Sequence, residues 1–155
     1  METLFTGYTK ELEKELATDL SVSVWKRRKH SKVRRCCLHT RCTLATTENI
    51  ERYCSFHTEF MQTVLAEHAH KARFYLLYDL RDTATPEGLK STLVPFVQLH
   101  NRFREEYKRV LIGTAIIINN ATLQMLLNGI FSTVYNPARP VRILTSPDEL
   151  DDEWR

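Results

Sequence analysis

The residues best suited to chemistry are cysteines and histidines in the first half of the chain. Three cysteines between positions 36 and 42 flank His39, and Cys54 is followed three residues later by His57. Cysteine and histidine are the usual ligands of structural zinc, and a cysteine beside a histidine can also serve as a nucleophile with its base. Zinc binding and cysteine catalysis are therefore the first chemistries to test against the spacing.

The spacing argues against both. Adjacent residues of a strand point to opposite faces, so Cys36 and Cys37 do not converge on one ion. The adjacent cysteine pair and the Cys54-x-x-His57 pair do not form a recognised zinc motif, and no orienting group or oxyanion site accompanies Cys54 and His57. The sequence also lacks glycine-rich phosphate loops and the nucleophile-elbow motif. We predict core cysteines, no metal, no cofactor and no enzymatic activity.

The best polar candidates for a binding site follow an aromatic and apolar run. Asp79 and Asp82 flank Arg81 there, and open α/β sheets bind ligands at the carboxyl ends of their strands. Thr83 and Thr85 come next, at the predicted start of a helix, whose N–H groups could hold a phosphate. A plainer interpretation makes Asp79 a strand-end acceptor, Asp82 a turn former and Thr85 a helix cap. The predicted ligand or partner site comprises Asp79, Arg81, Asp82, Thr83 and Thr85, with Thr83 and Thr85 as phosphoacceptor candidates.

Positive charge is concentrated in one short segment. Seven of the ten residues from 26 to 35 are Lys or Arg, although the whole chain has a net charge of only +3. Such a block can bind nucleic acid or another anionic surface, or it can be the solvated tip of a hairpin. The sequence pI of about 8.7 is below the value of about 9 that nucleic-acid-binding domains usually exceed. The candidate residues for an anionic partner are Lys26, Arg27, Arg28, Lys29, Lys32, Arg34 and Arg35.

Length and composition indicate one ordinary globular domain. The chain has 155 residues, of which 43% are hydrophobic and 26% are charged, and this is enough apolar mass for a core. No apolar run approaches the ~20 residues that span a bilayer, and the N-terminus lacks the basic and apolar regions of a signal peptide. We therefore expect an intracellular, cytoplasmic protein with reduced cysteines.

Hydrophobic periodicity predicts the elements that position these residues in the first half. Leucines recur every four residues from Leu12 to Leu20, which predicts a short helix over 10–17 within an N-terminal extension, 1–19. From Leu20 the pattern alternates, and it alternates again from Val33 to Leu44. Together these runs predict a β-hairpin with the basic segment at its tip. A helix follows from Thr47, its predicted cap, to about residue 70.

The second half alternates strands and helices. The predicted elements are a strand over 73–79, a helix starting at Thr85 and kinked at Pro95, an apolar central parallel strand over 110–118, a helix from Asn119 or Asn120 to about 135, a strand over 140–144, and a helix from Ser146 to Trp154. The order β-β-α-β-α-β-α-β-α predicts an α/β fold. We expect a single domain with a mostly parallel sheet covered by helices and a β-hairpin at the N-terminal edge.

Three features of the second half are shared with a known family: the strand end at residues 78–82, the apolar strand that runs into residues 119–121, and the closing segment at 140–149. In these features residues 73–154 resemble the STAS domain of bacterial anti-sigma-factor antagonists, and its relatives with CRAL-TRIO-like lipid-binding character. This resemblance implies a non-enzymatic protein-interaction or regulatory module, or one subunit of a larger assembly. In antagonist members a phosphorylated Ser stands two residues after the strand's Asp. That position is Arg81 here, so the phosphorylation switch does not transfer directly, although Thr83 and Thr85 follow closely.

A small apolar ligand or a lipid is the alternative partner. In this alternative the helices over the sheet part to form an apolar pocket. Its predicted lining consists of Phe96, Phe103, Met125, Leu126, Ile130 and Phe131. The sequence therefore leaves three kinds of partner open: a protein, an anionic surface and a small apolar molecule.

Overall fold

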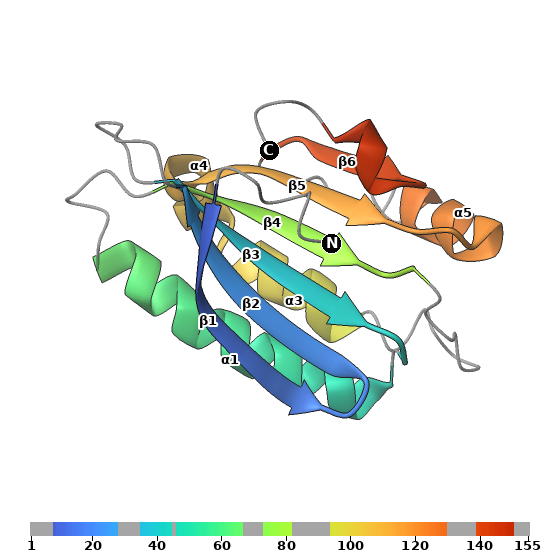
Figure 1. Cartoon of the computed structure of the whole chain (residues 1–155), viewed down its shortest axis with the longest axis horizontal. Coiled ribbons are helices and arrows are strands. Elements are labelled where there is room, and N and C mark those ends of the chain that lie inside the picture. The colour runs from blue at the N-terminus through green and yellow to red at the C-terminus, as the bar shows by residue number, and fades with distance from the viewer. Residues whose placement is uncertain are drawn as a thin grey trace.

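Six strands form one mixed sheet, in which they lie in the order of the chain (Figure 1). The computed structural model describes residues 8–27, 35–44, 46–66, 73–81, 94–129 and 139–150. The strands are β1 (Tyr8–Ala17), β2 (Leu20–Arg27), β3 (Arg35–Cys42), β4 (Arg73–Asp79), β5 (Leu111–Ile117) and β6 (Val141–Leu144). The helices are α1 (Thr47–Ala66), α3 (Val94–Arg102), α4 (Arg104–Val110), α5 (Ala121–Gly129) and the 3-10 helix η4 (Pro147–Glu149).

The N-terminal helix predicted for residues 10–17 is wrong, because this segment is the edge strand β1. It pairs antiparallel with β2 across a tight turn, and the ladder has two irregularities. Most of its side chains are exposed, and Leu12 is 45% exposed. The alternating Lys and Glu residues favour a helix when considered locally, but pairing with β2 overrides that weak preference. Charged side chains also suit an edge strand, since they hinder pairing with other chains.

The predicted hairpin is confirmed. β2 and β3 pair antiparallel from Leu20 opposite Cys42 to Lys26 opposite Cys36. Cys36, Leu38 and Cys42 enter one core cluster, as the alternation predicted. The connection between the two strands, residues 28–34, lies outside the described residues.

The sheet is parallel only from β3 onward. β3, β4, β5 and β6 pair parallel in sequence order, whereas β1, β2 and β3 are antiparallel. The expected parallel pairing is therefore found only from β3 to β6, and the sheet as a whole is mixed. Successive right-handed crossovers that advance in one direction place their helices on the same face. The residues of α1, α3, α4 and α5 accordingly join one core cluster.

The helix predicted from Thr47 is confirmed as α1, but its cap is one residue earlier. The backbone N–H of Asn49 donates to the Thr46 hydroxyl at 3.1 Å, and the N–H of Ile50 donates to the Thr46 carbonyl. The buried face includes Tyr53, His57 and Met61, at helical spacing. α1 is the longest described helix, with 20 residues, and it is too polar to span a bilayer; the other described helices are too short.

The kink expected at Pro95 is not found there. Pro95 lies in the first turn of α3, where a missing N–H is tolerated, and the break between α3 and α4 falls at Phe103. The predicted start of this helix at Thr85 lies outside the described residues. Phe103 itself is buried in the core.

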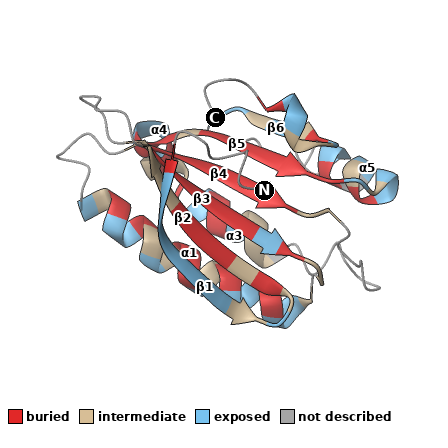
Figure 2. Ribbon diagram, in the orientation of Figure 1, coloured by how far each residue is buried: buried red, intermediate tan, exposed pale blue. Residues whose placement is uncertain are grey.

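β5 is buried on both faces, as its continuous apolar run predicted, although it is the fifth of six strands rather than the central one. Ile116 contributes to the core between sheet and helices, and Ile117 contributes to a second cluster on the opposite face. Figure 2 shows the middle strands buried along most of their length, in contrast to β1.

The C-terminal elements confirm their predicted starts, and the predicted end of α5 near residue 135 lies outside the described residues. The Asn120 side chain caps α5 by accepting from the Leu123 N–H at 3.1 Å, and α5 is described as far as Gly129. The Ser146 hydroxyl accepts from the Asp148 N–H, as predicted for a cap. The helix predicted to reach Trp154 is wrong, because the single 3-10 turn ends at Leu150, whose backbone is extended.

Candidate ligand-binding site

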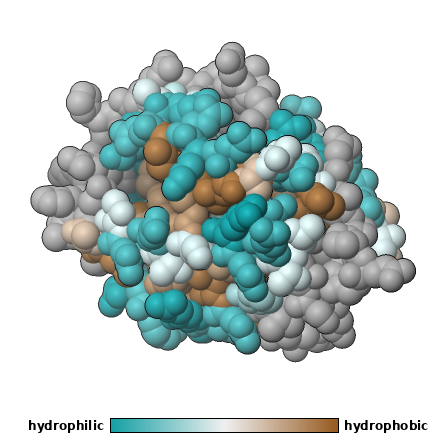
Figure 3. All heavy atoms as spheres, turned by 90° about the horizontal axis from the view of Figure 1, so that it is seen from below, coloured by the Kyte–Doolittle hydropathy of each residue, from teal (hydrophilic) through white to brown (hydrophobic). Residues whose placement is uncertain are grey.

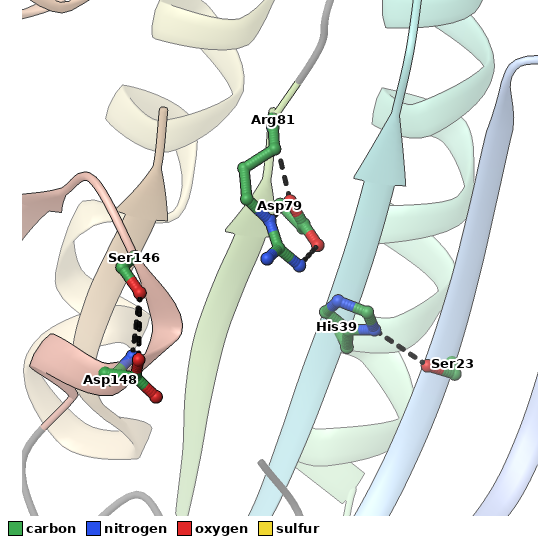
Figure 4. Close-up of polar contacts among 6 residues, drawn as sticks. All are labelled: Ser23, His39, Asp79, Arg81, Ser146 and Asp148. Atoms are coloured by element: carbon green, nitrogen blue, oxygen red, sulfur yellow. Dashed lines mark hydrogen bonds and ion pairs between the residues drawn. The ribbon is translucent and has the colours of Figure 1, made fainter. Parts of the chain in front are cut away.

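The predicted polar site centres on an ion pair at the end of β4. The Arg81 guanidinium donates a hydrogen bond to each carboxylate oxygen of Asp79, with Nε 2.9 Å from Oδ1 and Nη2 2.7 Å from Oδ2 (Figure 4). The Arg81 backbone N–H also donates to Oδ1. Asp79 is 2% exposed, and the Arg81 side chain is 33% exposed. Asp79 therefore acts as a strand-end acceptor, and its carboxylate is already satisfied. Asp82, Thr83 and Thr85 lie outside the described residues.

Arg81 decides the charge state of Asp79. Burial raises the pKa of this carboxyl group, but the hydrogen bonds and charge of Arg81 outweigh burial and lower its pKa below 3.8. Asp79 is consequently ionised at neutral pH and does not serve as a general acid. Two-point binding by a guanidinium also leaves little capacity for a metal ion.

Ser23 on β2 and His39 on β3 stand opposite each other, near Asp79. These three residue types are those of the Ser-His-Asp triad of hydrolases. The Ser23 hydroxyl is 3.3 Å from Nδ1 of His39 (Figure 4). It also accepts a hydrogen bond from the Trp25 indole at 2.9 Å. Burial lowers the pKa of His39 to about 4, and the Asp79 charge only partly opposes this. His39 is therefore a weak base, and Arg81 occupies the carboxylate, so this arrangement stabilises the sheet face.

The pairing of Ser23 with His39 was not found from the sequence. Its only signal is the register of the hairpin, in which Leu20 stands opposite Cys42 and therefore Ser23 stands opposite His39. A sequence pattern fixes which residues share a face, but it does not fix the register.

The cysteines are free thiols that serve as packing residues. Cys36 and Cys42 lie in the core under the helices, whereas Cys37 lies in the cluster on the other face. Burial raises the pKa of Cys37 and Cys42, and it raises the pKa of Cys54 to about 11. None of these three thiols is an activated nucleophile. Among the described residues, no three His, Cys, Asp or Glu side chains gather in a way that would hold a metal ion.

An apolar pocket opens at the carboxyl ends of β3 and β4, between the sheet and the helices. Its cavity volume is about 80 Å³. Leu80 and Phe96 are half-buried, and the other lining residues are buried. The lining comprises Leu20, Thr40, Cys42, Asn49, Ile50, Tyr53, Tyr78, Leu80, Phe96, Ile116 and Leu127. The pocket thus draws on four strands or strand ends and on three helices.

A chain of buried tyrosines and histidines runs inward from this pocket. The Tyr53 hydroxyl is 2.7 Å from the Tyr78 hydroxyl and 2.8 Å from Nδ1 of His57. Nε2 of His57 is 2.6 Å from the Tyr107 hydroxyl, and Nε2 of His100 is 3.3 Å from the Tyr78 hydroxyl. Connected polar groups of this kind hold neighbouring elements in one arrangement. Here they tie α1 to β4, α3 and α4.

Burial sets the charge states of these tyrosine and histidine side chains. It lowers the pKa of His57 well below 6.5 and lowers the pKa of His100 to about 3. It also raises the pKa of Tyr53 and Tyr78. All four side chains are therefore neutral at pH 7, so the polar network beside the pocket carries no charge.

The predicted lining of an apolar pocket is correct in part. Phe96 lines the pocket, whereas Phe103 packs in the core away from it. Met125 is 75% exposed, and Leu127 of the same helix takes the inward position instead. The side chains of Leu126, Ile130 and Phe131 lie outside the described part of the structure. On the face seen from below in Figure 3, apolar side chains show between hydrophilic ones.

The basic segment is described only at its two ends. Lys26 and Arg27 close β2, Arg35 opens β3, and Arg28, Lys29, Lys32 and Arg34 lie outside the described residues. The Lys26 ammonium is 3.1 Å from a Glu11 carboxylate oxygen, and both side chains are exposed. An exposed pair of this kind contributes about 0–1 kcal/mol.

Replacing Lys26, Arg27, Arg28 and Lys29 together with Ser should leave the melting temperature within about 2 °C of the wild type. Retention on a heparin column should weaken, because fewer counterions are released on binding a polyanion. The matched control exchanges Lys for Arg and Arg for Lys at the same positions and should keep the wild-type retention. Unfolding of the Ser variant would show that these side chains are structural.

No protein-family model matches the chain, and no curated protein or solved structure matches it either.

Proposed function

We propose that this chain is a non-enzymatic binding module that takes a small apolar molecule into the pocket between α1, α3 and the ends of β3 and β4. The observation that carries the proposal is the pocket itself. It is lined mainly by aliphatic and aromatic side chains, and the surface that it exposes is entirely apolar. Ligand sites are predominantly apolar, and in open α/β sheets they lie at the carboxyl ends of the strands.

The size of the pocket limits the ligand. Its volume of about 80 Å³ is smaller than the ~150 Å³ engineered cavity that binds benzene. The enclosed part therefore suits one edge of a small ring or the end of a short chain. Leu80 and Phe96 are half-buried, so a longer molecule would leave the pocket past them.

The chemistry of the nearby groups supports binding rather than catalysis. Asp79 is held by Arg81, the pKa of the Cys42 and Cys54 thiols is raised, and the histidines beside the pocket are neutral at pH 7. None of these groups is poised as a nucleophile or a general acid. A non-enzymatic role is also what the STAS and CRAL-TRIO resemblance implies. The protein and anionic-surface partners predicted from the sequence stay predictions.

Filling the pocket should abolish the binding of a small apolar probe. With toluene at about ten times its dissociation constant, the wild type should gain about 1.4 kcal/mol of stability. Leu127→Phe adds volume to the lining and should weaken toluene binding at least tenfold, measured by ligand-observed NMR and by the shift in melting temperature. Met125→Phe, at an exposed site on the same helix, is the matched control and should bind toluene like the wild type. Equal binding by both variants, or no binding by the wild type, would contradict the proposal.

A further inference from the structure

A second, polar groove lies on the face of the sheet that points away from the helices. Its cavity volume is about 450 Å³, within the range of ~300–1,000 Å³ that small-molecule sites occupy. The turn between β1 and β2 and the end of β3 supply its lining, which comprises Glu13, Glu15, Thr18, Asp19, Leu20, Ser21, Arg41 and Thr43. Unlike the apolar pocket, this groove combines carboxylates with a guanidinium group.

The register of the sheet decides which side chains form the two walls of the groove. Glu15 on β1, Ser21 on β2 and Arg41 on β3 stand in one row across the three strands. Their neighbours Val22 and Thr40 face the core cluster and the apolar pocket under the helices. Because successive residues of a strand point to opposite faces, Ser21 and Arg41 point away from the helices. The small Ser21 side chain is therefore the floor of the groove, between Glu15 and Arg41.

Of the three acidic side chains in the groove, two already have partners. A carboxylate oxygen of Glu13 is 3.1 Å from the Lys10 ammonium, and Oδ1 of Asp19 accepts a hydrogen bond from the Thr43 hydroxyl at 3.3 Å. Glu15 makes no ion pair with any described residue, and its side chain is exposed. Glu15 is thus the acid best placed to bind a cation.

The opposite wall carries a positive charge that does not reach Glu15. Arg41 is exposed, and within the described part of the chain it forms no ion pair. Side chains stand roughly perpendicular to a sheet, and two strand spacings separate Glu15 from Arg41, so their charged groups lie about 10 Å apart. A gap of this length excludes a direct ion pair and leaves room for a molecule between the two charges.

We infer that this groove binds a small amino acid in its zwitterionic form. The Arg41 guanidinium would donate two hydrogen bonds to the carboxylate of the ligand, and Glu15 would accept from its ammonium group. With about 2.8 Å for each contact, about 4 Å remains between the two charged groups of the ligand, which suits an α- or β-amino acid. This site lies on the other face of the sheet from the proposed apolar pocket and does not depend on it.

β-Alanine, propionate and propylamine form the decisive set of probes, because the first carries both charges and each of the others carries one. We expect the full chain to bind β-alanine at least fivefold more tightly than either of the others, measured by NMR titration at low salt. The dissociation constant should be roughly 1–10 mM, because both contacts are exposed to solvent.

Two variants assign the two charges of the ligand to the two walls. Arg41→Gln should weaken β-alanine binding at least fivefold and keep propylamine binding within about twofold. Glu15→Gln should weaken β-alanine binding by a similar factor and keep propionate binding within about twofold. Arg109→Gln on α4 and Glu59→Gln on α1 remove the same charges at exposed sites elsewhere, and these matched controls should bind β-alanine like the wild type.

The inference is overturned if the wild type binds the three probes equally or binds none of them. It is also overturned if either groove variant binds β-alanine as tightly as the wild type. Toluene binding should be the same in the wild type and in all four variants, so a failure of this inference is distinct from a failure of the proposed function.

Discussion

Ile117→Asp should prevent the chain from folding. Ile117 is fully buried in β5, between β4 and β6, and it belongs to the apolar cluster that includes Leu77 and Leu144. An aspartate there would bury a carboxyl group without a partner and remove the apolar contacts of the isoleucine. The expected loss exceeds about 4 kcal/mol, against a total stability of about 5–15 kcal/mol for an ordinary domain. Circular dichroism should show loss of cooperative thermal unfolding.

Leu12→Asp is the matched control for this prediction. Leu12 also lies in the sheet, but on the edge strand β1, where it is 45% exposed. An exposed carboxylate is hydrated, so this variant should lose less than about 1 kcal/mol. A soluble Ile117→Asp protein that melts at the wild-type temperature would show that the sheet topology is wrong.

Acidification from pH 7 to pH 5 should destabilise the protein strongly. Burial lowers the pKa of His57 well below 6.5, of His39 to about 4 and of His100 to about 3. Above pH 6.5 these groups are neutral in both the folded and the unfolded state, so the stability is then at its highest. Below pH 6.5 the unfolded chain takes up protons that the folded chain cannot bind until its own lower pKa values are reached.

The size of the effect follows from the proton linkage. Burial of His39 and burial of His100 should each cost about 1.4 kcal/mol of folding free energy per pH unit below 6.5, or about 2 kcal/mol at pH 5. Together these two histidines predict a loss of roughly 4 kcal/mol, which corresponds to a fall of roughly 8–16 °C in melting temperature for a chain of this size, and His57 acts in the same direction. Calorimetry at pH 7, 6 and 5 measures this slope.

His39→Gln separates the contributions. Glutamine does not titrate and can still bond to Ser23, and His39 lies apart from the Tyr-His chain on the other face of the sheet. The variant should therefore show a shallower pH dependence than the wild type while keeping most of its stability at pH 7. A melting temperature that stays constant from pH 7 to pH 5 would mean that these histidines are not buried and neutral.

Most strands and the main helix could be predicted from local patterns. The alternation from Leu20 to Val24 gave β2, the apolar run from Val110 to Ile118 gave β5, and the helical period after Thr47 gave α1. These patterns are reliable because burial of one face of a strand or helix, or of both faces of a strand, produces a characteristic spacing of apolar residues. The capping roles of Asn120 and Ser146 could also be predicted, since each cap bonds only to residues close in sequence.

The first strand could not be predicted from its own residues. The segment from Lys10 to Ala17 has helix-forming residues, and only its partner strand makes it extended. The sequence pattern also could not decide whether Met125 or Leu127 is the inward-facing residue of α5. A helix of nine residues has a weak pattern, so small errors in its phase change which side chain is buried.

The sequence by itself determined the α/β class, the hairpin of β2 and β3, and Asp79 as the end of a buried strand. Only the tertiary structure decided which polar groups meet. The Tyr53–His57–Tyr107 contacts join residues up to 50 positions apart, and the pairing of Ser23 with His39 depends on register. The pocket has the same origin, because its walls come from strands and helices that crossovers bring together. Local periodicity selects which face of each element is buried, but the contacts across that buried face are set by packing among distant elements.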